Sequence, residues 1–159
     1  MQPRDLLKVA DDLVHSAGRG RPSQAHLRRA VSATYYALFH DLAQTAANLL
    51  IGGQKAHISE GAWKEVYRAL EHGTARGKFE NKTLMERFPQ ELQDFADRFN
   101  DLQKKRNSAD YDPYENFSKS AVHQDIRLAE RVIENFKAVP KRDQRAFAAY
   151  SIIKNRKTR

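Results

Sequence analysis

The sequence predicts an all-α protein, an up-and-down bundle of four to five longer helices followed by a short C-terminal helix. In every long segment, apolar residues recur at spacings of three, four and seven, which is the period of a helix with one buried face. No segment alternates apolar and polar residues as a half-buried strand would, and no segment repeats. Pro, Gly and Ser residues that favour helix starts and stops separate these segments.

The first two helices are expected over residues 3–17 and from Ser23 to about Leu49. Pro3 suits the first turn of a helix, and Ser23 is a plausible N-cap for the longer one. "IGG" at 51–53 ends the second helix. The apolar stripe of the first comprises Leu6, Val9, Ala10, Leu13 and Val14. The stripe of the second comprises Leu27, Val31, Tyr35, Leu38, Leu42 and Leu49.

The later helices are predicted from the same spacing and the same start and stop residues, except over 74–88, where no helix is expected. A helix is expected over 60–72, and 74–88 is predicted to be a loop with one turn at "LMERF" because its periodicity is weak. Pro89 opens a helix that continues into "KKRNSADYDPYE" at 104–115 and stops before Pro113. Ser118 or Ser120 caps the fifth long helix. Pro140 opens a short helix whose apolar residues are Ala146, Ala149, Tyr150 and Ile153.

Composition indicates an ordinary globular chain of 159 residues, of which 40% are hydrophobic and 30% charged. This length fits one domain with a proper core. No apolar run is long enough to span a bilayer, and the N-terminus does not resemble a secretory signal, so no membrane association is expected. The absence of cysteine excludes disulfides and thiolate zinc sites and suits a cytoplasmic protein.

The net charge of +8 is concentrated at the C-terminus. Residues 140–159 carry seven basic side chains against one acidic one, a net charge of +6, so the other 139 residues carry only +2. We therefore predict a helical bundle over 1–139 and a basic C-terminal helix or tail over 140–159. Such a tail either attracts polyanions, nucleic acid first, or is a solvated terminus.

Motifs of common enzymes are absent. The sequence has no phosphate-cradling glycine loop, no HExxH and no GxSxG. The histidines show no metal-ligand spacing among themselves, so neither a metal nor another cofactor is expected; they are His15, His26, His40, His57, His72 and His123.

Two stretches carry polar residues beside an apolar stripe. In "RRAVSATYYALFHD" (28–41), helical spacing puts four side chains on one line: Arg29, Ser32, Tyr36 and His40. Alternatively, the tyrosines are core aromatics with hydroxyls at the rim, and Arg29 and His40 are solvated.

The second stretch places Arg106 four residues after Leu102, where the helix should still be apolar. A buried guanidinium needs an anion or a polar cavity, and Asp110, four residues on, is the nearest candidate anion. Alternatively, the cations of this last turn only complement the helix dipole, which explains Lys104 and Lys105 better than Arg106.

Together these stretches resemble the HEPN domains, the "higher eukaryotes and prokaryotes nucleotide-binding" family. "RRAVSATYYALFHD" resembles the second helix of the family, and "RNSADYDP" (106–113) resembles its signature at the end of a later helix. The resemblance covers roughly residues 3–137. It implies a helical bundle that forms a homodimer through the faces bearing the signature, with RNA or a nucleotide bound between the copies.

In catalytic members of this family, the signature is an Arg, a polar residue and, further on, a His, and two copies cleave RNA without metal. The resemblance assigns the first two positions to Arg106 and Asn107, but the His position falls on Tyr111. Arg106 could stabilise a phosphorane. Tyrosine has an unperturbed pKa of about 10 and is a poor base at pH 7. His40 could replace the missing histidine only if the second helix faces the same cleft.

Three functions remain open. The first is a dimeric module that binds a nucleotide or RNA phosphate through Arg29, Ser32, Tyr36, His40, Arg106 and Asp110. Bacterial members of the family often pair with a nucleotidyltransferase in toxin–antitoxin-like systems, so the resemblance implies such a chain as a candidate partner. The second is an active metal-independent ribonuclease, and the third is a structural dimerising bundle.

Overall fold

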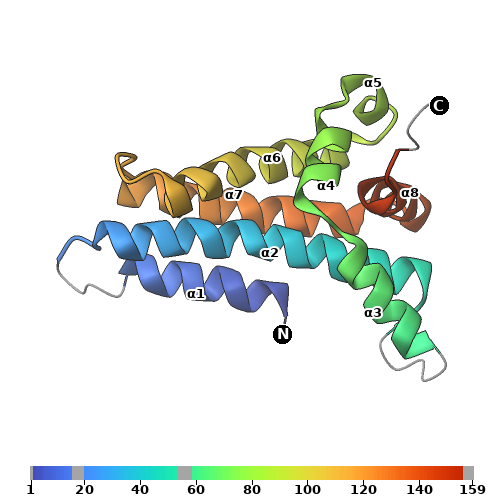
Figure 1. Ribbon diagram of the computed structural model, residues 1–159, viewed down its shortest axis with the longest axis horizontal. Helices are drawn as coiled ribbons and strands as arrows, with labels where there is room; N and C mark the ends of the chain where they lie inside the picture. The colour runs from blue at the N-terminus through green and yellow to red at the C-terminus, as the bar shows by residue number, and fades with distance from the viewer. Residues whose placement is uncertain (1, 16–19, 54–58, 156–159) are drawn as a thin grey trace. The chain divides into compact units, whose positions relative to one another are not determined.

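The computed structural model describes residues 2–15, 20–53 and 59–155. Within these ranges the chain forms helices and no strand, so the all-α prediction is confirmed (Figure 1). The helices are α1 (Pro3–His15), α2 (Gln24–Leu50), α3 (Glu60–Ala69), α4 (His72–Glu80), α5 (Lys82–Met85), α6 (Gln90–Tyr111), α7 (Lys119–Ala138) and α8 (Lys141–Ile152). No helix in the described ranges is both long and apolar enough to cross a bilayer.

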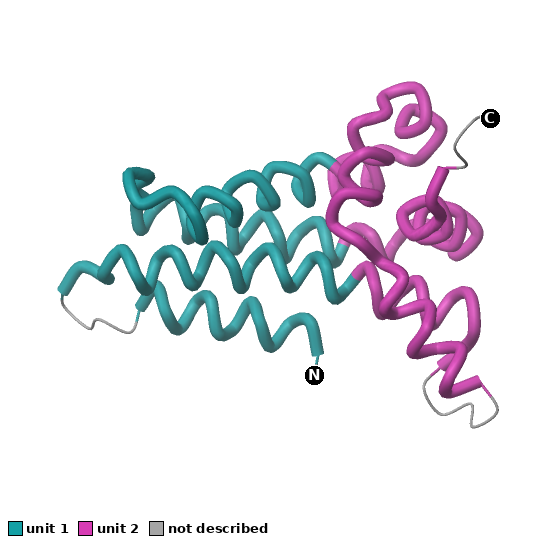
Figure 2. The backbone as a smooth tube through the Cα atoms, in the orientation of Figure 1, with its two compact units in different colours: residues 1–41, 97–134 teal, residues 42–96, 135–159 magenta. Residues whose placement is uncertain are grey.

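The chain divides into two compact units, coloured separately in Figure 2. Unit 1 comprises residues 1–41 and 97–134, and unit 2 comprises residues 42–96 and 135–159. The long helices α2, α6 and α7 contribute residues to both units.

Unit 1 is a bundle of α1, the first part of α2, the second part of α6 and most of α7. Side chains from all four helices bury each other in one cluster, which includes Ala10, Leu27, Ala109 and Ile126. Tyr35 and Phe99 are fully buried in the same unit, with ring centroids 5.3 Å apart. Packing of apolar helix faces accounts for this unit, as the sequence pattern predicts.

The buried stripe of α1 is shifted from the predicted one, because it includes Leu7, which the predicted stripe omits. Leu7, Ala10 and Val14 are buried, whereas Leu6 is only half-buried and Val9 is 48% exposed. The buried residues follow one helical line at steps of three and four, and the predicted stripe included the edge of that line. The prediction that Val9 lies on the buried stripe is therefore wrong.

Unit 2 is organised around Phe147 of α8, which is fully buried. The Phe147 ring stacks on Phe79 at 5.0 Å between centroids and meets Phe88, Phe95 and Phe136 edge-on at 5.4–6.0 Å. Aromatic pairs at these distances add to the free energy gained by burial. The helix expected after Pro140 is thus a packed part of unit 2 over residues 141–152 and not a solvated tail.

The buried face of α8 is not the one that the apolar residues predict. Ala146, Tyr150 and Ile153 are exposed, and the buried positions are Gln144, Phe147, Ala148 and Ser151. The polar members of this face are satisfied locally: the Gln144 amide donates to the Val139 carbonyl at 2.8 Å, and Ser151 donates to Ala148 at 2.6 Å. Buried polar residues of this kind are invisible to a search for apolar spacing.

The prediction of a loop over 74–88 is wrong, because α4 and α5 lie there. Ala75 and Phe79 of α4 are buried, so the burial of these side chains within unit 2 compensates for the weak helical pattern of the segment. The Asn81 side chain caps α5 by accepting from the Leu84 amide at 3.1 Å. Helix α3, expected over 60–72, ends at Ala69 because the backbone of Leu70 is extended.

Helix boundaries elsewhere follow the predicted signals. Ser23 accepts from the His26 amide and Ser118 accepts from the Ala121 amide, both at 3.2 Å, so Ser118 is the cap at the start of α7. Gly52 has φ +125°, a conformation that residues with a Cβ rarely adopt. This glycine marks the end of α2 as expected.

Candidate functional site

Arg106 lies on the inner side of α6 in unit 1, and its side chain is only 12% exposed. The guanidinium carbon lies 5.3 Å from the ring centroid of Tyr35 and 5.7 Å from that of Tyr36, both on α2. A planar, weakly hydrated guanidinium is well suited to such cation–π contacts. The two aromatic rings therefore hold this cation at the edge of the core.

The anion nearest to Arg106 is Asp110, as predicted, but the contact is long. Arg106 Nη1 and Asp110 Oδ2 are 3.5 Å apart, at the limit of a hydrogen bond. The hydroxyl of Ser32 donates to the other oxygen of Asp110 at 2.7 Å, so this carboxylate is shared. Arg106 Nε is buried and has no hydrogen-bond partner among the described residues. The hydrogen-bonding capacity of Arg106 is thus incompletely used.

Two neighbours of this cation have shifted pKa values. Burial raises the pKa of Tyr35, while the positive charge of Arg106 acts to lower it, so the phenol stays protonated. Burial lowers the pKa of His40, which favours an uncharged imidazole at neutral pH. The His40 ring lies 6.0 Å from that of Tyr36 between centroids. α2 therefore brings His40 next to a ring that contacts Arg106.

Arg28, which the sequence analysis did not single out, holds the end of α6. Its guanidinium donates to the carbonyls of Ala109 and Asp112, both at 2.8 Å, and also to the carbonyl of Glu115. The last carbonyls of a helix lack intrahelical partners and carry partial negative charge. Arg28 therefore fixes the chain where α6 stops, close to the candidate signature.

The segment after α6 is also held by α2. Gln24 donates to the Phe117 carbonyl at 2.8 Å and accepts from the Phe117 amide at 2.9 Å. A groove of about 570 Å³ runs beside this segment. The residues lining it are Gln24, Arg28, Ala109, Asp110, Tyr111, Asp112, Pro113 and Asn116. Tyr111 and Tyr114 are 78% and 91% exposed, an unusual display of large aromatic side chains.

The predicted site residues fall into two groups. The structure brings together Ser32, Tyr36, Arg106 and Asp110, with His40 beside Tyr36. Arg29, Asn107 and Tyr111 are exposed. Tyr111 is five positions after Arg106 and is turned about 140° from it around α6, so within one chain the two side chains leave the helix on different faces.

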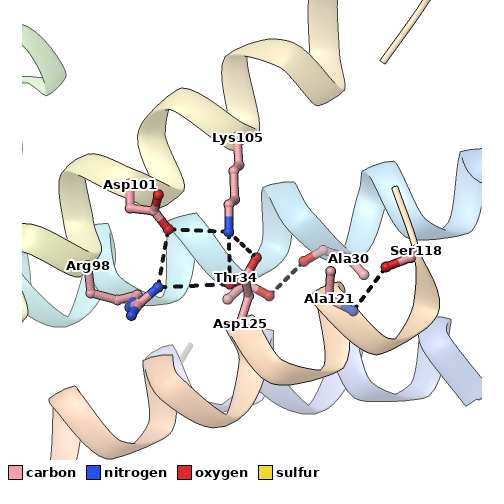
Figure 3. A network of polar contacts seen from close by, with 8 residues as sticks. All are labelled: Ala30, Thr34, Arg98, Asp101, Lys105, Ser118, Ala121 and Asp125. Atoms are coloured by element: carbon pink, nitrogen blue, oxygen red, sulfur yellow. Dashed lines mark hydrogen bonds and ion pairs between the residues drawn. The ribbon is translucent and has the colours of Figure 1, made fainter. Parts of the chain in front are cut away.

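A second polar network, in which α6 meets α7 inside unit 1, is shown in Figure 3. Lys105 Nζ lies 2.9 Å from Asp125 and 3.3 Å from Asp101, and Arg98 lies 3.1 Å from Asp101. Asp125 is buried. Burial acts to lower the pKa of Lys105, but hydrogen bonding and attraction from Asp125 and then Asp101 outweigh it and raise the pKa. Lys105 is thus a partner of buried Asp125 and does more than complement the helix dipole.

Comparisons with family models, curated proteins and solved structures found no match. The resemblance to HEPN domains therefore rests on the two sequence stretches alone. The geometry adds that one of these stretches lies against the other within unit 1, through Arg106, Tyr36, Ser32 and Asp110.

Proposed function

We propose that this chain is a HEPN-like dimeric module that binds a phosphate of RNA or of a nucleotide in a cleft shared by two copies. The observation that carries the proposal is the state of Arg106. Its guanidinium is positioned by two aromatic rings, yet its only described carboxylate contact is 3.5 Å long. A cation held in place but weakly paired is preorganised for an anionic ligand.

A phosphate would replace the long Asp110 contact. Asp110 also accepts from Ser32, so the carboxylate keeps a hydrogen bond when the guanidinium turns to the ligand. Arginine binds phosphate through two parallel N–H donors, which gives both affinity and orientation. Two copies related by symmetry would supply two such cations to one cleft.

Exposed aromatic side chains near the end of α6 support the part of the proposal that requires a second copy of the chain. Tyr111 and Tyr114 lie at and just beyond the end of α6. Large exposed aromatics are typical of protein interfaces and of surfaces on which nucleic-acid bases stack. Pairing with a nucleotidyltransferase chain is part of the proposal and rests on the resemblance alone.

A metal-independent ribonuclease is the second candidate, and the position of His40 favours it. This imidazole lies beside Tyr36 on α2, and burial lowers its pKa. An uncharged imidazole at neutral pH can accept a proton from a 2′-hydroxyl. His40 could thus supply the base that Tyr111 cannot.

The test compares Arg106→Met with Lys104→Met by fluorescence anisotropy of a labelled single-stranded RNA. Both variants lose one positive charge from α6, but Lys104 is exposed and lies two residues away. Methionine keeps much of the apolar stem of Arg106, so its packing on Tyr35 is largely retained. We expect Kd to rise about tenfold or more in Arg106→Met and about twofold or less in Lys104→Met.

Arg106→Lys serves as a further control, since it keeps the charge and removes the two-donor geometry. It should bind with intermediate affinity. Equal losses in Arg106→Met and Lys104→Met would show that the RNA senses only surface charge. Unchanged binding in Arg106→Met, with a lower melting temperature, would establish the purely structural role.

A further inference from the structure

A second cluster of polar side chains lies in unit 1, where α1 meets α7. Asp11 and His15 are one turn apart on α1, and His123 comes from α7. Each offers a ligand atom, and these atoms lie within 4.8 Å of one another. Asp11 Oδ1 is 3.6 Å from His15 Nδ1 and 3.9 Å from His123 Nδ1, and the two imidazole rings meet edge-on at 5.6 Å.

The hydrogen bonding of this cluster is incomplete. Asp11 Oδ1 and His123 Nδ1 are buried atoms without a hydrogen-bond partner among the described residues. Buried polar atoms normally have a partner, and each unsatisfied one costs free energy. His15 Nδ1 lies 2.8 Å from the Asp11 carbonyl. If Nδ1 donates there, the tautomer is fixed with Nε2 as the basic nitrogen, as in most metal-bound histidines.

We propose that Asp11, His15 and His123 bind a divalent transition-metal ion such as Zn²⁺. Two imidazole nitrogens and one carboxylate oxygen are a donor set that Zn²⁺ and its neighbours accept. Metal–ligand bonds of about 2.0–2.1 Å in a tetrahedron put ligand atoms about 3.3 Å apart. The ligand atoms lie within 4.8 Å of one another, and rotation of these partly exposed side chains can bring them to that separation, with His15 binding through Nε2.

Three protein ligands leave one position of a tetrahedral ion open. His15 and His123 also line a groove of about 740 Å³, together with Ser118, Lys119 and Ser120. An ion in this cluster would therefore be reached by water or a small anion through the groove. Spacing among histidines does not reveal this cluster, because one of its members is Asp11 and the two histidines lie on different helices.

One contact competes with the ion. Arg127 Nη2 lies 4.0 Å from Asp11 Oδ1, but its Nη1 pairs with Glu130 at 3.1 Å. Arg127 is more than half exposed and can keep Glu130 while Asp11 turns to the metal. The proposed metal site uses none of the residues around Arg106, so the result of its test does not depend on whether the proposed function is correct.

The test is calorimetric titration of Zn²⁺ into the full chain, without a histidine tag and freed of metal by chelation. We expect one ion per chain. Asp11→Asn, His15→Ala and His123→Ala should each weaken binding at least tenfold. Asp12→Asn and His26→Ala are matched controls, because Asp12 adjoins Asp11 and His26 is an exposed histidine of the same unit. Both controls should bind as wild type does.

Co²⁺ provides a second readout, since visible absorption reports its coordination directly. The wild-type chain should show one saturable Co²⁺ spectrum that Zn²⁺ displaces and His123→Gln loses. Circular dichroism would establish that each variant is folded. The proposal is overturned if the wild type binds Zn²⁺ no more tightly than the variant that combines Asp11→Asn, His15→Ala and His123→Ala, or if the controls lose as much affinity as the cluster variants.

Discussion

Two arginines near the end of α6 differ in what surrounds them. Arg28 donates to several backbone carbonyls and is well satisfied, whereas Arg106 lies on two aromatic rings and is weakly paired. The first arrangement stabilises a chain turn, and the second leaves hydrogen-bonding capacity for a ligand. Of the two, Arg106 is therefore the one to which the proposed function assigns the phosphate.

The sequence could predict Arg106 but not Arg28. Arg106 occupies a position that helical spacing marks as buried, and a charge there requires a reason. Arg28 binds backbone carbonyls 81 and 84 residues away, and every residue type carries a carbonyl. No side-chain pattern signals such a contact. The approach of His123 to Asp11 likewise depends on how α1 and α7 pack.

Tyr111→His tests the departure from the catalytic signature. Tyr111 is 78% exposed, so the substitution should leave stability within about 0.5 kcal/mol of wild type. It places an imidazole where catalytic relatives of the resembled family carry one. We expect wild type to cleave a labelled RNA poorly in EDTA and Tyr111→His to cleave it measurably faster, with an optimum near neutral pH.

The control for this prediction is Tyr114→His, which puts an imidazole at the other strongly exposed tyrosine. It should leave cleavage unchanged. Robust cleavage in EDTA by wild type, lost in Arg106→Met and in His40→Gln, would favour the ribonuclease and assign the base to His40.

At the scale of elements, α6 combines three tasks along 22 residues. Its apolar residues Phe99 and Leu102 enter the core, its Lys105 pairs with Asp125 of α7, and its Arg106 reaches the rings of α2. Consecutive positions on a helix point about 100° apart, so Lys105 and Arg106 serve different neighbours. This explains why the helix carries a run of cations.

Lys105→Met should destabilise unit 1, because among the described residues it leaves buried Asp125 with Arg98, at 3.9 Å, as its one cationic partner. Lys105 is partly exposed, so solvent screens the pair, and we expect a loss of about 1–2 kcal/mol. Lys104 is an exposed neighbour of Lys105, and Lys104→Met should change stability by less than about 0.5 kcal/mol. Urea unfolding followed by circular dichroism measures both.

The same pair gives a pH dependence with a definite sign. The folded pKa of Lys105 is raised, so its stabilisation is complete below the unperturbed lysine pKa of about 10.4 and is lost as pH rises through the folded value. The difference between wild type and Lys105→Met should be constant from pH 7 to 9 and shrink above pH 10.4. If the stability difference shrinks between pH 7 and 9, the pH dependence arises from a group other than Lys105.

The helices were predictable to the extent that their buried faces are apolar. α2 and α6 meet this condition over most of their length: their predicted stripes are buried except at Leu49, although Thr34, Asp41 and Gln103 are buried as well. α4 has only Ala75 and Phe79 buried, and α8 buries Gln144 and Ser151. For these helices, contacts within unit 2 override weak local signals, so the pattern alone could not place them.

In the whole molecule, part of the positive charge near the C-terminus lies on α8, which is packed in unit 2. α8 presents Lys141, Arg142 and Arg145 on its exposed side while Phe147 is buried. Lys154 pairs with Glu71 at 3.0 Å within unit 2. Removal of residues 140–159 would therefore remove core as well as charge, and charge-reversing substitutions on the exposed side of α8 are the better probe of polyanion binding.

The proposed function requires two copies of the chain to share the site around Arg106. Light scattering coupled to gel filtration at micromolar concentration, with and without a 5′-phosphorylated RNA oligonucleotide, tests it most directly. We expect a species of about twice the 18.3 kDa chain mass, to which the RNA binds and whose RNA binding Arg106→Met weakens about tenfold or more. A single-chain mass at every accessible concentration, with RNA binding intact, would contradict it.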